Sequence, residues 1–126
     1  MNIPKDLKYT NDHEWVKIEG DIGTIGLTDY AQDQLSDIVF VEMPIVGDSF
    51  EKDEAFGTVE AVKTVADMMM PVGGEIIEIN ENLEDAPETI NSDPFGDGWI
   101  VKIKIANPDE LNELLDAAEY KELTEL

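Results

Sequence analysis

Apolar and polar residues alternate over short stretches through most of this 126-residue chain, which is the pattern of β-strands that bury one face. The first two stretches lie within residues 13–28 and flank Glu19-Gly20-Asp21, so this segment is predicted to form a β-hairpin. Further strands are predicted at residues 37–43, 75–79 and 99–105, where β-branched residues stand between turn-forming ones. The pattern therefore predicts a mainly β protein.

A short helix is predicted in the N-terminal half. Thr28 is a suitable N-cap for a helix over residues 29–36, in which Ala31 and Leu35 lie four positions apart on one face. Residues 80–98 are rich in Asp, Asn, Pro and Gly, and a long ordered loop is predicted there.

A second helical segment is predicted at the C-terminal end, over about residues 108–126. Asn107 is a suitable cap, and Pro108 suits the first helical position. Apolar residues then recur at helical spacing, so we expect this helix to pack its leucines on the strand layer. These residues are Leu111, Leu114, Leu115 and Ala118.

Lys63 stands between two further strand-like stretches, within a hairpin predicted over about residues 56–71. Such a hairpin would hold the lysine out at its tip, where Glu60 and Asp67 would offer a modifying enzyme an acidic recognition feature. An amine displayed in this way suits acylation by a ligase, although a single lysine at a turn is by itself unremarkable. In the run at residues 68–70, alternation predicts that the outer two methionines pack inward and the middle one faces outward.

The composition is strongly acidic, with 30 Asp and Glu against 8 Lys, and the formal net charge is −22. Nucleic acid is excluded as a partner because phosphate binding needs basic side chains. An anionic membrane surface is disfavoured for the same reason. The chain has no cysteine, no membrane-length apolar stretch and no signal-peptide pattern at its start. A single domain over residues 1–126, in a cytoplasmic protein, is expected.

Enzyme chemistry finds no support in the residue patterns. His13 is the one histidine, and it has neither a second histidine for a metal site nor a nucleophile pattern around it. A structural hydrogen-bonding role is the more common one for such a residue. Carboxylates are too numerous for any pair to stand out as an acid and a base, and no phosphate-binding loop is present. We therefore predict no catalytic residue and no metal.

Several segments together resemble the glycine cleavage system H protein family. The segment at 60–67, EAVKTVAD, followed by PVGGE at 71–75, is similar to the lipoyl-attachment region of that family. The likeness covers about residues 3–120, and the order and spacing of its short motifs make it specific. The other matching segments are YTNDHEWV at 9–16, GLTDYAQDQL at 26–35, DIVFVE at 37–42 and NSDPFGDGW at 91–99.

This resemblance implies a lipoyl/biotinyl-domain-like β-sandwich (a barrel-sandwich hybrid) with lipoate in amide linkage to Lys63, as N6-lipoyllysine. It also implies a carrier without catalytic activity of its own. In that family a pyridoxal-phosphate glycine decarboxylase (P protein) loads an aminomethyl group onto the lipoyl arm. A tetrahydrofolate-dependent aminomethyltransferase (T protein) removes it, and dihydrolipoyl dehydrogenase (L protein) reoxidises the dithiol. A lipoate ligase or lipoyl transferase is the further partner implied.

Family members shelter the labile aminomethyl group in a surface cleft. The resemblance implies that Glu14 and Asp67 are partners for its amine here, and a carboxylate beside an ammonium group is physically sensible. The apolar wall would be formed by Leu27, Ala31 and Leu35. Either acid could instead be an ordinary surface carboxylate, given how many the chain has.

Three alternatives to glycine cleavage are open at this point. An H-like protein that relays lipoyl groups to 2-oxo acid dehydrogenases, or serves sulfur metabolism, would keep the same lysine. A biotin carrier usually has methionine on both sides of its lysine, whereas Val62 and Thr64 flank Lys63. An acidic adaptor that is never modified is the third alternative.

Overall fold

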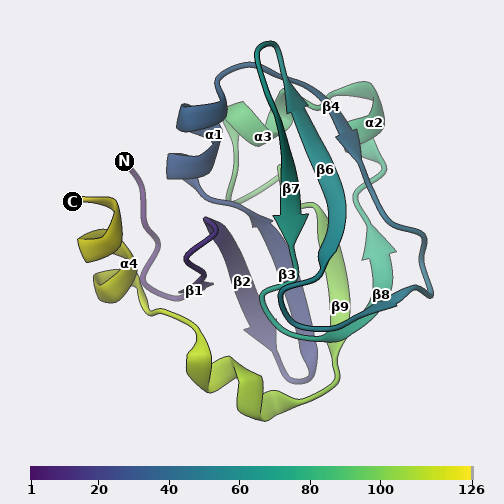
Figure 1. Cartoon of the computed structure of the whole chain (residues 1–126), viewed down its shortest axis with the longest axis vertical. Coiled ribbons are helices and arrows are strands. Elements are labelled where there is room, and N and C mark those ends of the chain that lie inside the picture. The colour runs from purple at the N-terminus through teal and green to yellow at the C-terminus, as the bar shows by residue number, and fades with distance from the viewer. Residues whose placement is uncertain (126) are drawn as a thin grey trace.

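Two antiparallel sheets enclose the main apolar core in residues 1–125, the part of the chain that the computed structural model describes (Figure 1). The larger sheet has six strands in the order β1-β2-β3-β9-β8-β5, and the smaller has three in the order β4-β6-β7. The strands are β1 (Lys8–Tyr9), β2 (Glu14–Glu19), β3 (Ile22–Leu27), β4 (Ile38–Glu42), β5 (Ser49–Phe50), β6 (Ala55–Ala61), β7 (Val65–Met69), β8 (Gly74–Ile79) and β9 (Val101–Ile105).

Helices are short and lie around the sheets. The predicted N-terminal-half helix is present as α1, and the mainly β sandwich predicted from the pattern and the resemblance is confirmed. The helices are α1 (Asp29–Leu35), α2 (Asn82–Asp85), α3 (Thr89–Ser92), the 3₁₀ segment η1 (Pro108–Glu113) and α4 (Ala117–Thr124).

The core follows directly from the alternation of residues along the strands. Val16 pairs with Ile25 across β2 and β3, and both side chains are fully buried. Met68 and Met70 are also fully buried, while Met69 between them is half-exposed, as alternation predicts. Each buried aliphatic side chain of this size contributes about 1.5–3 kcal/mol of burial free energy.

A second, smaller core lies on the other face of the larger sheet. Tyr120 of α4 stacks on Tyr9 with ring centroids 4.7 Å apart, and Trp15 is buried beside them. Gly26 pairs with Trp15, and a Cβ at this glycine would lie 2.6 Å from the indole ring. The absence of a side chain at Gly26 therefore makes room for the tryptophan.

The segment at 80–98 is ordered, but it contains two helices where only a loop was predicted. Leu83 in α2 and Ile90 in α3 are fully buried, so each helix is anchored to the main core by one apolar side chain. Asn80 closes the segment, since its side-chain amide donates to the backbone oxygens of Asp97 and Trp99 at 2.8 and 2.7 Å. Helices of four residues are too short to show a helical period in the sequence.

The prediction of one continuous C-terminal helix is wrong for the described residues; residue 126 lies outside them. Between η1 and α4 the chain is extended, because Leu115 forms an isolated β-bridge with Tyr9 through two backbone hydrogen bonds of 2.8 Å. Asp116 then starts α4 with a capping box that includes Glu119. Consequently Leu111 and Leu114 pack on the main core, whereas Leu115 packs on the second core.

Candidate functional site

Lys63 lies exposed at the tip of the β6–β7 hairpin, which is the uppermost part of the molecule in Figure 1. The Ala61 amide donates to the Thr64 oxygen at 2.8 Å, and Val62 and Lys63 are the two residues between them. The Val62 amide donates to the Asp37 oxygen at 3.2 Å, which ties the tip to the start of β4. The lysine therefore stands on a braced turn, with its side chain in solvent.

A pocket of about 180 Å³ lies between α1, the start of β2, the end of β3 and the β6–β7 hairpin. All five residues that the resemblance placed around a cleft line this one pocket, although they are distributed over residues 14–67. They are Glu14, Leu27, Ala31, Leu35 and Asp67. The remaining lining residues are Asp12, His13, Tyr30, Gln34, Val59 and Ala66.

Helix α1 forms one wall of the pocket, and hydrogen bonds stabilise both of its ends. Thr28 caps the helix, since its hydroxyl oxygen accepts from the Ala31 amide at 3.1 Å, as predicted. At the other end, the Asn91 side chain of α3 donates to the Ser36 oxygen at 2.7 Å and accepts from the Ile38 amide at 2.9 Å. The helix that carries Ala31 and Leu35 is thus held by both of its ends.

Glu14 carries a buried carboxyl group, and only 1% of the residue is exposed. One of its oxygens accepts from the Thr10 hydroxyl at 2.7 Å, and the other accepts from the Met69 amide of β7 at 3.2 Å. Burial raises the pKa of Glu14 from 4.5 to about 8, against the opposing effect of these two hydrogen bonds. The carboxyl is therefore mostly protonated at neutral pH while the pocket holds no cation.

Asp67 has a different setting from Glu14, because its residue is exposed on β7. It pairs with Thr58 of β6 and lines the pocket next to Ala66. One carboxyl group of the pocket is thus on a buried residue and the other on an exposed one.

His13 belongs to a hydrogen-bonded cluster behind the pocket that residue patterns did not predict. Its Nδ1 lies 2.8 Å from the Tyr120 hydroxyl, which also lies 2.7 Å from the Thr28 hydroxyl. The His13 ring packs on Tyr30 with centroids 4.5 Å apart, and its backbone has a φ of 69°, in the left-handed region. Burial lowers the pKa of His13 below its ordinary value of 6.5 and outweighs the Asp12 carboxylate.

Helical and hairpin spacing could have found four of the lining residues that were missed. Tyr30 and Gln34 are adjacent to Ala31 and Leu35 on α1, while Val59 and Ala66 form one cross-strand pair of the hairpin. The link from His13 to Tyr120 spans 107 positions, and no local pattern signals it.

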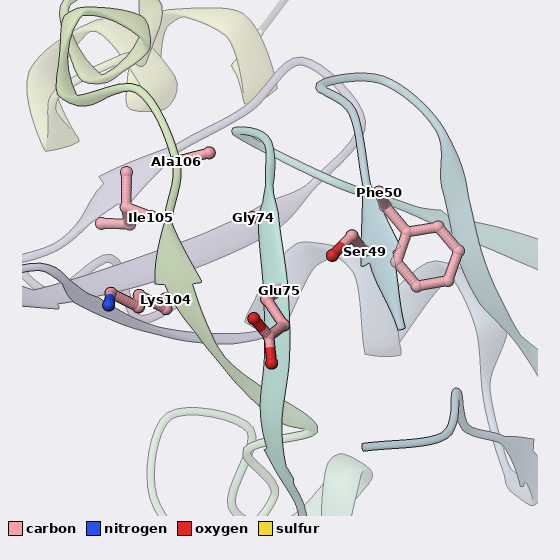
Figure 2. A pocket seen from close by; sticks show the side chains of 7 residues that line it. All are labelled: Ser49, Phe50, Gly74, Glu75, Lys104, Ile105 and Ala106. Carbon is pink, nitrogen blue, oxygen red and sulfur yellow. The ribbon is translucent and has the colours of Figure 1, made fainter. Parts of the chain in front are cut away.

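Larger hollows occur elsewhere on the surface, and none holds a buried carboxyl group. One of about 350 Å³ lies over β5, β8 and β9 and is lined in part by Ser49, Glu75 and Lys104 (Figure 2). Figure 2 shows the Lys104 side chain directed away from Glu75. Size therefore does not distinguish the Glu14 pocket from the other hollows, whereas the combination of a buried carboxyl group with an apolar wall does.

Residues 1–125 contain no group of three or more His, Asp or Glu side chains that could hold a metal ion. In the same range, no helix has the length and apolar character needed to cross a membrane.

Comparison with known proteins gives consistent matches along nearly the whole chain. The family model described as glycine cleavage H-protein matches residues 7–126. A glycine cleavage system H protein of Chlorobium limicola is 57% identical over 125 residues, covering 98% of both chains, and one of Bacteroides thetaiotaomicron is 55% identical over 121 residues, covering 96% of both. The crystal structure of a glycine cleavage system H protein from Mycobacterium marinum superposes with a TM-score of 0.91 at 40% identity, covering 98% of this chain and all of that one.

Proposed function

Because the chain belongs to the glycine cleavage H-protein family, we propose that Lys63 is the residue that holds its lipoyl group, in amide linkage to Nζ. Membership makes the protein the lipoyl-bearing carrier of the glycine cleavage system and not an enzyme. The observation that carries the assignment to Lys63 is its exposed place at the tip of a braced hairpin. An acylating enzyme can reach such an amine without any change in the fold.

The pocket beside the hairpin fits the group that Lys63 would carry. When bound, the lipoyl group supplies the disulfide and dithiol sulfurs that accept the aminomethyl group and then give up electrons. Leu27, Ala31 and Leu35 offer an apolar wall that excludes water from this part of the surface. Glu14 lies at the buried side of that wall and Asp67 at the exposed side, so either carboxyl can accept hydrogen bonds from an amine.

Glu14 suits a pocket that alternates between empty and loaded forms. As a neutral acid it avoids leaving an unpaired charge in a buried place, which would be costly. When an amine enters, the Glu14 proton can pass to the amine nitrogen, and the two resulting charges pair with each other. The Thr10 and Met69 hydrogen bonds hold the carboxyl in place in both forms.

The partners follow from this role. We infer that the glycine decarboxylase, the aminomethyltransferase and dihydrolipoyl dehydrogenase each engage the carrier in turn, and that a lipoate ligase or lipoyl transferase modifies Lys63. The formal charge of −22 supports docking faces on these enzymes that are basic, because such charge steers association. A cytoplasmic location is part of the same proposal.

The test is a mass measurement on three proteins, each expressed with lipoate and a lipoate ligase. The wild-type chain should gain a single lipoyl adduct that peptide mapping places on Lys63. Lys63→Arg keeps the positive charge and the fold but offers no acylable amine, so it should gain none. Lys17→Arg, which changes another exposed lysine, is the control and should be modified like the wild type. An adduct on a different lysine, or an unmodified Lys63 beside a modified control lipoyl domain, contradicts the assignment.

A further inference from the structure

Four exposed apolar side chains surround the tip that carries Lys63. Val62 and Val65 belong to the hairpin, while Val39 and Phe40 belong to β4, more than 20 positions earlier in the chain. Between about one half and two thirds of each residue is exposed, from 48% for Val39 to 68% for Val62. We call these four residues the hairpin face. They make up half of the large apolar residues that are exposed in residues 1–125.

The register of the smaller sheet places Phe40 and Val65 on one surface; the exposed Val39 is adjacent in the chain to Phe40, and the exposed Val62 to Lys63. Phe40 pairs with Glu60, and Glu60 pairs with Val65, so the three side chains point to the same side in one row nearest the tip. A register shift between Ile38 and Phe40 leaves both Val39 and Phe40 exposed, whereas regular alternation would bury one of them. The backbone contact between Val62 and Asp37 brings the start of β4 to the tip (Figure 1).

A phenylalanine that is half exposed on an edge strand is not by itself informative, because aromatic residues favour strands. Four exposed apolar side chains close to the lysine proposed to be acylated are informative. Such an arrangement gains free energy only when a partner covers it. The position of the hairpin face identifies the partner as one that works directly at the tip.

The charge around the hairpin face further limits which partner can cover it. Exposed acidic residues lie within and beside the hairpin face, with Glu60 between Phe40 and Val65 in the row, and Lys63 is the one lysine on the strands and tip of this sheet. A second copy of the chain would bring another charge of −22 to the same place, which disfavours self-association. The fitting occupant therefore presents basic side chains among apolar ones. The acidic residues are Asp37, Glu42, Glu60 and Asp67.

We propose that the hairpin face, with Phe40 at its centre, is the docking surface of the enzyme that acylates Lys63. This inference rests on the proposed lipoylation of that lysine. The enzyme makes an acyl adenylate from lipoate and ATP, and pyrophosphate leaves; the neutral Nζ then attacks the carbonyl carbon and an amide C–N bond forms. The C–O bond to the phosphate breaks, AMP leaves, and the amine releases its proton to solvent.

This step requires Nζ itself to enter the active site of the partner, so that enzyme must contact the residues immediately around the tip. Enzymes that act on the sulfurs work at the far end of a longer arm and can leave these residues uncovered. The hairpin face is therefore specific to the acylation step, and recognition includes β4 as well as the hairpin.

The test compares initial rates of lipoylation of unmodified variants by a purified lipoate ligase with lipoate and ATP. Phe40→Thr removes the aromatic ring but keeps a residue suited to a strand, and Val65→Thr replaces a methyl group by a hydroxyl at the other end of the row. Each should lower kcat/KM for the carrier by about tenfold or more, which is the range of central interface residues. Phe40→Leu keeps an apolar side chain and should restore most of the rate. Ile45→Thr is the matched control, because Ile45 is also exposed but lies beyond the end of β4 that is remote from the tip, and it should change the rate less than twofold.

The same variants, driven to full lipoylation with excess ligase, are then assayed with the glycine decarboxylase. Unchanged decarboxylation beside slow lipoylation supports the proposal, with thermal midpoints confirming that each variant is folded. Wild-type lipoylation rates for both threonine variants overturn it. A loss confined to decarboxylation would assign the hairpin face to the decarboxylase, and a change in sedimentation that reveals a dimer would assign it to a second copy of the chain. Either result overturns the proposal. Failure of wild-type Lys63 to accept lipoate contradicts the proposed function, and this outcome is separate from the variant rates.

Discussion

Replacing Glu14 with glutamine should change how the free energy of unfolding depends on pH. Glu14 is the buried carboxyl group of the pocket, and burial raises its pKa from 4.5 to about 8 in the folded protein. Glutamine has the shape of the protonated acid, and its oxygen can accept from the Thr10 hydroxyl or from the Met69 amide; the hydrogen bond that is lost changes stability by the same amount at every pH. The variant therefore keeps the packing and removes the titration.

The direction in which stability changes with pH follows from comparing the protonation of Glu14 in the folded and unfolded chains. Between pH 4.5 and about 8 the folded wild type keeps a proton on Glu14 that the unfolded chain has lost. This contribution to stability is complete below pH 4.5, declines as pH rises through the window, and is gone above about pH 8. At about 1.4 kcal/mol for each pH unit, the whole window corresponds to about 5 kcal/mol as an upper value. From pH 5.5 to 8.5 the wild type should lose about 3 kcal/mol relative to Glu14→Gln.

The measurement is urea denaturation of both proteins at pH 5.5, 6.5, 7.5 and 8.5, taking the difference between them at each pH. The difference cancels the contributions of the many other acidic groups, which the two proteins share. Glu19→Gln removes one exposed carboxylate and is the control, with a difference from wild type that should stay nearly constant. Parallel curves for wild type and Glu14→Gln would refute the reasoning, because Glu14 would then already be ionised in the folded protein at pH 5.5.

Two further predictions test the surroundings of the pocket. Tyr120→Phe removes the hydroxyl shared by Thr28 and His13 and should lower the free energy of unfolding by about 1–3 kcal/mol in urea denaturation. Adding Thr28→Val should cost less than the sum of the two single changes, and strict additivity would show that the contact is not energetically coupled. Asp67→Asn should shorten the lifetime of the aminomethyl-loaded carrier by about two- to fivefold, the range for an exposed ion pair, as measured by release of formaldehyde and ammonia. An unchanged release rate would remove Asp67 from the proposed site.

Most strands could be predicted from the sequence because apolar residues that face the main core alternate with residues on the other face of the sheet. Alternation in residues 13–28 gives the β2–β3 hairpin, whose turn has Gly20 at a φ of 64°. The same reasoning places the buried methionines correctly. The tip of the β6–β7 hairpin lacks such a glycine signal, so its two-residue form at Val62-Lys63 could not be derived.

What the pattern missed depends on contacts between residues far apart in the chain. The break between η1 and α4 exists because Leu115 pairs with Tyr9, and this competes with the helical spacing of the leucines. The cleft residues were placed by resemblance, and no local signal separates Glu14 from the other acidic residues. Its importance lies in burial, which results from packing of β2 against α1 and β7.

Strand β7 runs from the tip that carries Lys63 to the pocket that contains Glu14 and Asp67. One strand of this small sandwich therefore connects the proposed attachment site to the pocket. Lys63 precedes this strand, Asp67 lies within it, and the Met69 amide near its end holds the Glu14 carboxyl. Four residues of extended chain from Lys63 to Asp67 span at most about 13 Å. The four-carbon stem of lysine is too short for that distance, whereas the added carbon chain of a lipoyl group makes up the difference. Under the proposed lipoylation the pocket comes within reach of Lys63 only after acylation, and this gives a reason for an acylating enzyme to recognise a surface at the tip and not the pocket itself.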